Sequence, residues 1–186
     1  MTIHDEHPFA TPEPDRDPLR RFRGRMAAPV SIWTTGTGAG REGWTVSSML
    51  IADGALPAAP EPGVAARQAE VLGLLDEEAE LLDALGRTGT VSVNLLPADQ
   101  EQLAEAFART MPAPGGPFRA GEWTDTEWGP RLAGVPWLGA RVIGEPAYAG
   151  WALLVRAAVE QVDPAGADPA IHLRGRYLDP SVLSKP

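Results

Sequence analysis

The sequence contains no cysteine, which excludes disulfide bonds, cysteine nucleophiles, iron–sulfur clusters and cysteine-ligated zinc together. Basic residues are outnumbered, because 16 Lys and Arg stand against 25 Asp and Glu and give a formal net charge of −9. Such an acidic chain argues against a sequence-independent nucleic-acid binder, which needs a basic face to displace counterions. No stretch approaches the roughly 18 apolar residues of a membrane-spanning helix.

The N-terminus also lacks the features of a secretory signal, because residues 1–7 are polar and acidic. We therefore expect a cytoplasmic protein with no membrane segment and no nucleic-acid partner. A length of 186 residues suits one domain with loose ends. We predict a flexible acidic arm over residues 1–18, one domain over residues 19–180, and a short tail over residues 181–186.

Side chains that could carry out catalysis by themselves are few. The chain has three histidines, of which His4 and His7 fall in the predicted arm. His172 stands alone in a predicted strand, where a structural or surface role is favoured over a metal-ligand role. No GxSxG motif accompanies it, which disfavours a hydrolase. The composition thus predicts neither a metal site nor a catalytic triad.

One glycine-rich segment, residues 38–43, has the GxGxxG spacing of a dinucleotide-binding loop. That fingerprint requires a helix to begin at the third glycine, so that its N-terminus holds the pyrophosphate. The residues that follow, Trp-Thr-Val-Ser-Ser, favour a strand instead. We therefore interpret the segment as the connection of an antiparallel hairpin between residues 29–35 and 44–51.

The remaining pattern alternates short strands with a few helices. An arginine-rich helix is predicted near residues 19–26, a second after Asp76 as its cap, and a third after Asp99, which has capping-box spacing with Gln102. Because most strands follow one another through short turns, we predict a mainly β fold with an antiparallel sheet closed into a barrel. The further predicted strands are residues 69–75, 90–96, 137–147, 151–162 and 171–178.

Hydroxyl side chains are concentrated on one of these strands, at Thr45, Ser47 and Ser48. Polar groups on a half-buried strand cost free energy unless they form hydrogen bonds. Pairing across the sheet would satisfy them and contribute a few tenths of a kcal/mol each. Binding of a polar ligand at a sheet edge is the alternative, and spacing alone leaves both open.

The order of these motifs is more informative than any one of them. After the arginine-rich helix come Thr34-Thr35, residues 43–48 (Gly-x-Thr-Val-Ser-Ser), Val93-Asn94-Leu95, a helix with the pattern Q-L-A-x-x-F-A-R over residues 102–109, and a late R-G-x-Y strand. From residue 19 to 177 this order resembles the flavin reductase-like family, the FMN-binding split β-barrel proteins. The resemblance implies an antiparallel split β-barrel and a homodimer that binds FMN or FAD in a groove at the dimer interface.

The resemblance also implies which residues hold the flavin. The segment from Trp44 to Ser48 matches the strand that hydrogen-bonds the edge of the isoalloxazine ring, and Arg109 matches the region where a basic residue meets the flavin phosphate. Backbone N–H groups on a rigid strand suit this task because they stabilise charge that accumulates on flavin reduction without reorganising. The implied cofactor-binding residues are Trp44, Thr45, Val46, Ser47, Ser48, Asn94 and Arg109.

The implied activity is NAD(P)H:flavin reductase, with hydride passing from the nicotinamide to the flavin, and a monooxygenase as a partner that uses the reduced flavin. Where the family commonly carries Gly-Asp-His, this sequence reads Ala149-Gly150-Trp151. Trp151 can stack on a ring or pack into the barrel mouth, and packing is favoured. The alternatives are a flavin-binding sensor without catalysis, or a split barrel that uses deazaflavin F420 or haem.

Overall fold

A computed structural model describes residues 17–57 and 67–183. The predicted arm therefore lies almost wholly outside the described residues, as do most of the loop after residue 57 and the last three residues of the tail. Pro18, which the sequence assigns to the arm, begins helix α1 (Pro18–Arg23). Asp17 caps this helix, because its carboxylate accepts from the backbone N–H groups of Leu19 and Arg20.

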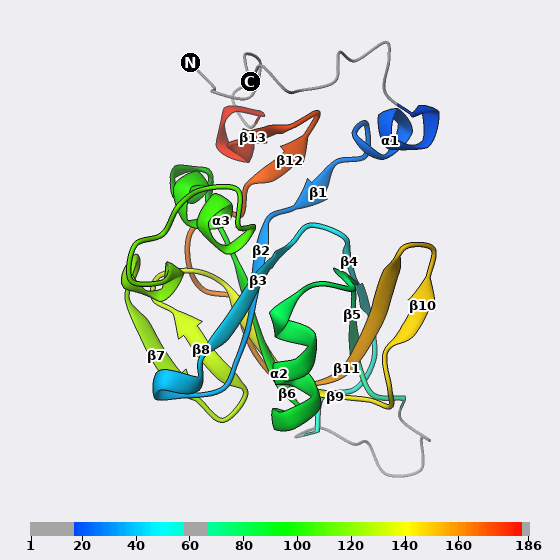
Figure 1. The fold of residues 1–186 in the computed structure, drawn as a ribbon, viewed down its shortest axis with the longest axis vertical. Coiled ribbons are helices and arrows are strands. Elements are labelled where there is room, and N and C mark those ends of the chain that lie inside the picture. The colour runs from blue at the N-terminus through cyan, green and yellow to red at the C-terminus, as the bar shows by residue number, and fades with distance from the viewer. Residues whose placement is uncertain (1–16, 58–66, 184–186) are drawn as a thin grey trace.

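The body of the molecule is one antiparallel sheet of eight strands, drawn in Figure 1. Seven strands form a continuous path and the eighth, β10, pairs with β11 alone. The order along the path is β3 (Glu42–Val46), β2 (Ser31–Thr35), β6 (Thr90–Leu95), β9 (Trp137–Val142), β11 (Ala152–Asp163), β5 (Glu70–Asp76) and β4 (Met49–Ala52). Strand β10, outside this path, spans Ala147–Ala149.

The sheet curls so that a short turn joins its two end strands, which do not pair with each other. Strands β3 and β4 lie at opposite ends of the path, yet only Ser47 and Ser48 separate them in the chain. The backbone N–H of Leu74 on β5 donates to the carbonyl of Ser48 at 2.9 Å, which fastens the junction. The predicted mainly β, antiparallel split barrel is thus confirmed, and the hairpin β2–β3 follows the predicted connection, which contains the short helix η3 (Gly38–Gly40).

The barrel interior is filled from opposite walls. Trp33 on β2 is fully buried and reaches across to Gly73 on β5, where a Cβ atom would lie 2.5 Å from its ring. A glycine is needed at position 73 because protein interiors are close-packed and leave no room for a methyl group there. Val71, Leu75, Val91 and Val155 complete this part of the core.

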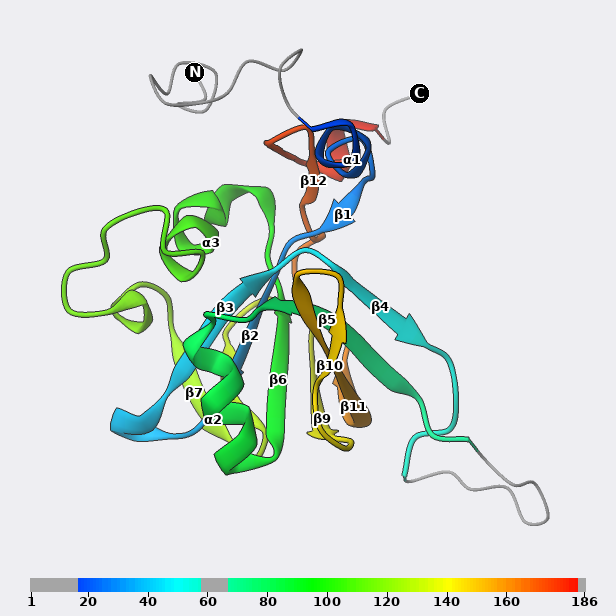
Figure 2. The same ribbon diagram turned by 45° about the vertical axis from the view of Figure 1, so that its right-hand side comes forward.

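Two helices cover the sheet (Figures 1 and 2). Helix α2 (Glu80–Thr88) buries Leu81 and Leu85 and contacts β2 and β3, and Gly89 ends it in the left-handed conformation. Helix α3 (Glu101–Phe107) buries Leu103 and Phe107 in a second core cluster. A short helix, η4 (Ala98–Gln100), precedes it.

The caps predicted for α2 and α3 do not form. The Asp76 carboxylate accepts from the N–H of Glu78 in a turn, so helix α2 begins only at Glu80. The predicted capping box of Asp99 and Gln102 does not form, because residue 99 lies inside η4 and α3 has no side-chain cap.

Smaller units complete the fold. A three-stranded sheet of β1 (Ala28–Pro29), β12 (Ile171–Leu173) and β13 (Arg176–Leu178) lies with α1 at the end of the molecule where β3 passes to β4 (Figures 1 and 2). Between α3 and β9, where the sequence predicts no element, lie η5 (Pro117–Arg119) and a hairpin of β7 (Trp123–Thr126) and β8 (Gly129–Leu132). The described part of the chain ends in η6 (Pro180–Leu183).

Candidate functional site

The hydroxyl-bearing segment was predicted to form one strand over residues 44–51, but the chain turns at Ser47 and Ser48. Strand β3 ends at Val46, and Ser47 and Ser48 carry the chain across to β4. Ser47 is half-buried and Ser48 is exposed, so neither side chain fills the barrel interior. Val46 is buried, and the Thr45 hydroxyl donates to the carbonyl of Ala104 at 2.6 Å.

The backbone at this turn is rich in unused donors. Within residues 17–57 and 67–183, the N–H groups and hydroxyls of Ser47 and Ser48 donate no hydrogen bond, although the Ser48 carbonyl accepts one. Strand β3 is also an end strand of the sheet, and such a strand leaves alternate N–H and C=O groups without a neighbouring strand. The β3 edge and its turn therefore offer several donors to a ligand.

Helix α3 lies along β3 and fixes its orientation. Thr45 bonds to Ala104, and a Cβ atom on Gly43 would lie 2.6 Å from the ring of Phe107. The helix thus passes the Thr45 end of β3 first and reaches the Gly43 end at its C-terminus. Arg109 follows directly, with a left-handed backbone (φ 60°) that is uncommon for a residue other than glycine.

The Arg109 side chain joins helix α2 to strand β3. Its Nη2 donates to Glu80 of α2 at 2.9 Å, lies 4.0 Å from a carboxylate oxygen of Glu42, and its guanidinium stands 5.6 Å from the centre of the Trp44 ring. Arg109 and Trp44 are thereby brought together at the start of β3. Ser47 lies three positions after Trp44, a distance of about 10 Å along an extended chain.

Asn94, by contrast, is buried, and its side chain forms hydrogen bonds within the protein. Its side chain is 0% exposed, its Oδ1 accepts from the N–H of Leu132 at 2.8 Å, and its Nδ2 donates to the carbonyls of Ile32 and Pro130. These bonds fasten β8 to β2 and β6. Of the seven predicted residues, the structure therefore places six on β3, beside its start or in the turn that follows it, and the Asn94 amide behind them.

The outer face of β4, β5, β10 and β11 carries leucines that are uncovered in the single chain, beside the ion pair of Arg156 and Glu70. Leu50 pairs with Leu72, and Leu74 with Leu154, and these positions alternate with the core residues of β5. Leu50 is 72% exposed and Leu74 is 40% exposed. Trp151, at the turn between β10 and β11, is 97% exposed, so the prediction that it packs into the barrel mouth is wrong.

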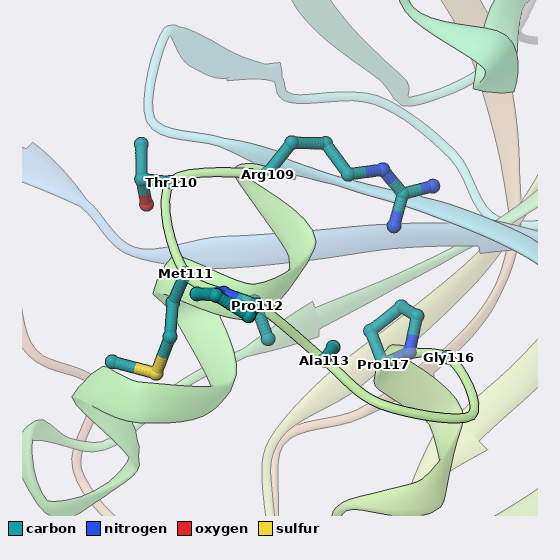
Figure 3. A pocket seen from close by; sticks show the side chains of 8 residues that line it. Arg109, Thr110, Met111, Pro112, Ala113, Gly116 and Pro117 are labelled. Atoms are coloured by element: carbon teal, nitrogen blue, oxygen red, sulfur yellow. The ribbon is translucent and has the colours of Figure 1, made fainter.

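Sequence reasoning missed the pockets beside Arg109. One of about 440 Å³ is lined by the loop after α3, and Figure 3 shows the Arg109 side chain extending along its rim toward Pro117. A second, of about 520 Å³, adjoins it and is lined by Arg41 and Arg119 as well as Arg109. Arg41 donates to the Asp125 carboxylate at 2.8 Å, and this hydrogen bond lowers the pKa of that carboxyl below its ordinary value.

No helix among the described residues is both long enough and apolar enough to cross a membrane. No group of three or more His, Asp or Glu side chains in residues 17–57 and 67–183 is arranged to hold a metal ion.

The family model described as "Flavin reductase like domain" matches residues 23–181. The chain belongs to this flavin reductase-like family. The curated NADH-dependent FMN reductase AsuE2 of Streptomyces nodosus subsp. asukaensis is 31% identical to it over 96 residues, which are 52% of this chain and 45% of AsuE2. The matched part of the chain therefore spans less than half the length of that relative.

Two solved structures of the family show the same fold. The NADH:FAD oxidoreductase SgcE6 of Streptomyces globisporus superimposes with a TM-score of 0.68 at 23% identity, covering 91% of this chain and 95% of that one. The flavin reductase component BorF of a bacterial two-component tryptophan halogenase gives a TM-score of 0.67 at 20% identity, covering 87% and 95%. The order of sequence motifs had thus identified the family correctly.

Proposed function

We propose that the chain is an NAD(P)H-dependent flavin reductase that binds the flavin ring along β3 and the Ser47–Ser48 turn. The observation that carries this proposal is the set of unused N–H and hydroxyl donors at the turn, on an end strand held rigid by α3. Such donors suit the ring, which supplies the redox chemistry when bound and accumulates negative charge at its N5 and carbonyl edge on reduction.

The chain's own residues would bind and orient the ring rather than react. Backbone donors of residues 44–48 hold one ring edge, and Arg109 lies at the opposite end of β3, where a phosphate on a ribityl chain can reach it. Asn94 supports the site from behind by holding β8 and β2 together. No side-chain acid or base is needed for hydride transfer between two cofactors.

The direct test is reduction of added flavin. Purified protein mixed with FMN or FAD should bleach the flavin absorbance when NADH or NADPH is added under anaerobic conditions. Flavin that binds tightly but is not reduced by either nicotinamide would favour the sensor alternative, and a protein that binds no flavin would reject the proposal. Because AsuE2 is named as NADH-dependent, NADH is the first donor to try.

The Ser47 hydroxyl offers the first mutational test. Replacing Ser47 by alanine should weaken flavin binding by about 1–3 kcal/mol if the hydroxyl donates to the bound ring. Fluorescence titration with riboflavin measures the change, and Thr124→Ala on exposed β7 serves as the matched control. An unchanged affinity would mean that the Ser47 hydroxyl does not contact the flavin and that only the Ser47 backbone can contribute to binding.

Arg109 offers the second test, because its charge is shared with Glu80. Arg109→Ala should weaken FMN by about 1–2 kcal/mol and riboflavin, which has no phosphate, hardly at all. Glu80→Gln should act in the opposite direction, since it releases the guanidinium from a competing carboxylate. Equal losses for the two flavins in Arg109→Ala would exclude the phosphate role.

We propose that a second copy of the chain covers the apolar outer face of β4, β5, β10 and β11. Leu50, Leu74 and Trp151 are large apolar side chains left in water there, and contiguous patches of this kind mark interfaces. Leu50→Asp should convert a dimer into monomers in light scattering, whereas Val162→Asp, at the far end of β11, should not. Monomeric wild-type protein at micromolar concentration would contradict the proposal.

The consumer of the reduced flavin is proposed to be a separate oxygenase or halogenase, since BorF is described as the reductase component of a two-component halogenase. Reduced flavin released by the protein should support such an enzyme without a stable complex between them.

A further inference from the structure

Beyond Arg109 lies a divided groove that the proposed flavin ring does not use. Its apolar half, about 440 Å³, is lined by Met111, Pro112, Ala113 and Pro117 (Figure 3). Its charged half, about 520 Å³, is lined by the side chains of three arginines and two glutamates. Arg109, Gly116 and Pro117 line both halves, so the two form one continuous groove around the Arg109 side chain.

The arginines come from separate elements and are held in place. Arg41, in the connection between β2 and β3, donates through Nε to Asp125 and lies 6.0 Å from the centre of the Phe118 ring. The same carboxylate accepts from the N–H of Gly38, which anchors the connection. In the described part of the chain, the two terminal nitrogens of Arg41 donate to no other group, so they are available to a ligand.

Arg119 is the arginine without an ion pair among the described residues that line this groove. Its side chain folds over the backbone of Gly115, where a Cβ atom would lie 3.1 Å from Nε. Gly115 has a φ of +81°, so it supplies both the turn and the space for this side chain. The glutamates, Glu42 and Glu80, both lie within 4.0 Å of Arg109 and offset its charge rather than that of Arg119.

An apolar compartment beside unused guanidinium donors suits a ligand with a flat apolar ring at one end and a phosphate at the other. Planar guanidinium groups bind phosphate oxygens with paired, charge-assisted hydrogen bonds. We propose that this groove binds the adenosine diphosphate portion of an adenine dinucleotide, with phosphate on Arg41 and Arg119 and adenine against Met111 and Pro117. The inference rests on the proposed function for the source of that group, which is FAD or NAD(P)H.

The consequence is a preference among flavins. If FAD is the source, the phosphate nearer the flavin ring lies at Arg109 and the second phosphate lies at Arg119, so FAD binds more tightly than FMN. If the nicotinamide dinucleotide is the source, Arg119 affects the KM for NADH and the two flavins bind alike.

The test begins with ADP as the probe, because ADP carries no flavin or nicotinamide. Isothermal titration should show ADP binding to the wild-type protein, and Arg119→Ala should weaken it about ten-fold or more. Arg119→Lys should recover part of the loss, because it keeps the charge but not the paired geometry. Arg87→Ala, an exposed arginine of α2 outside the groove, is the matched control and should change nothing.

Titrations with FAD, FMN and NADH then identify the source. Loss of the FAD-over-FMN preference in Arg119→Ala assigns the groove to FAD, and a raised KM for NADH alone assigns it to the nicotinamide dinucleotide. No measurable ADP binding at millimolar concentration, or equal binding by Arg119→Ala and wild type, overturns the inference even if flavin is reduced normally. ADP binding that depends on Arg119 in a protein that binds no flavin would keep the groove and reject the flavin reductase proposal.

Discussion

Replacing Phe107 by alanine is expected to lower the free energy of unfolding by about 3–5 kcal/mol. The Phe107 ring is 0% exposed and packs edge-on against Phe118, with ring centres 4.9 Å apart, and against Trp123 at 5.5 Å. On its other side the ring lies against Gly43 of β3. Deleting it leaves a cavity between α3, β3 and the β7–β8 hairpin that these rigid elements cannot refill.

Chemical denaturation followed by tryptophan fluorescence measures the loss, with Phe22→Ala on exposed α1 as the control, expected to change stability by less than about 0.5 kcal/mol. Because Phe107 holds α3 against β3, flavin affinity should fall only as the native population falls. A variant that keeps its stability but loses flavin would instead make Phe107 a binding residue.

The strands of the barrel were largely predictable because alternation of apolar and polar residues reports directly on a half-buried strand. The junction between β3 and β4 was not, since residues 44–51 form one unbroken run of strand-favouring side chains without glycine or proline. The turn at Ser47 and Ser48 is imposed by closure of the barrel, where the backbone N–H of Leu74 donates a hydrogen bond to the carbonyl of Ser48. Tertiary pairing, not local preference, decides that position.

The β7–β8 hairpin was missed for a similar reason. Its strands carry Asp125, Pro130 and Arg131, which disfavour a strand locally. The hairpin forms because Gly129, with a φ of +130°, allows its backbone to approach Thr34 and Thr35, where a Cβ atom would lie 2.7 Å from their backbone. Contacts with residues almost a hundred positions away determine this element, and no short window contains them.

The candidate site divides in the same way. The order of motifs along the chain identified the family and the β3 segment, because each motif is local. The groove lined by Arg41, Arg109 and Arg119 could not be foreseen, since these arginines come from the β2–β3 connection, the end of α3 and η5, which meet only in the folded chain. The uncovered face around Leu50 could not be predicted for another reason. A strand with apolar residues on both faces has the same sequence pattern as a strand that is buried on both faces.

Replacing Asn94 by leucine is the second change expected to be severe, lowering the free energy of unfolding by about 2–4 kcal/mol. Leucine has a similar volume but cannot accept from the N–H of Leu132 or donate to the carbonyls of Ile32 and Pro130. The N–H of Leu132 is then left in a buried environment without an acceptor, and an unsatisfied buried donor costs more than the bond itself was worth. Ser92→Ala is the control, since its hydroxyl makes only a long 3.5 Å contact with the Asn94 amide.

Asn94→Asp separates the two roles of this side chain through pH. A carboxyl group keeps an acceptor for Leu132 but faces two carbonyl oxygens, so burial there favours its neutral form and raises its pKa above the unfolded value of about 3.9. A raised folded pKa means that the variant is closest to the wild type below about pH 4 and loses stability as the pH rises toward 7. Unfolding experiments at pH 4 and pH 7 measure this slope against the wild type. Stability that does not depend on pH, together with a selective loss of flavin affinity, would place the Asn94 side chain at the flavin instead of behind it.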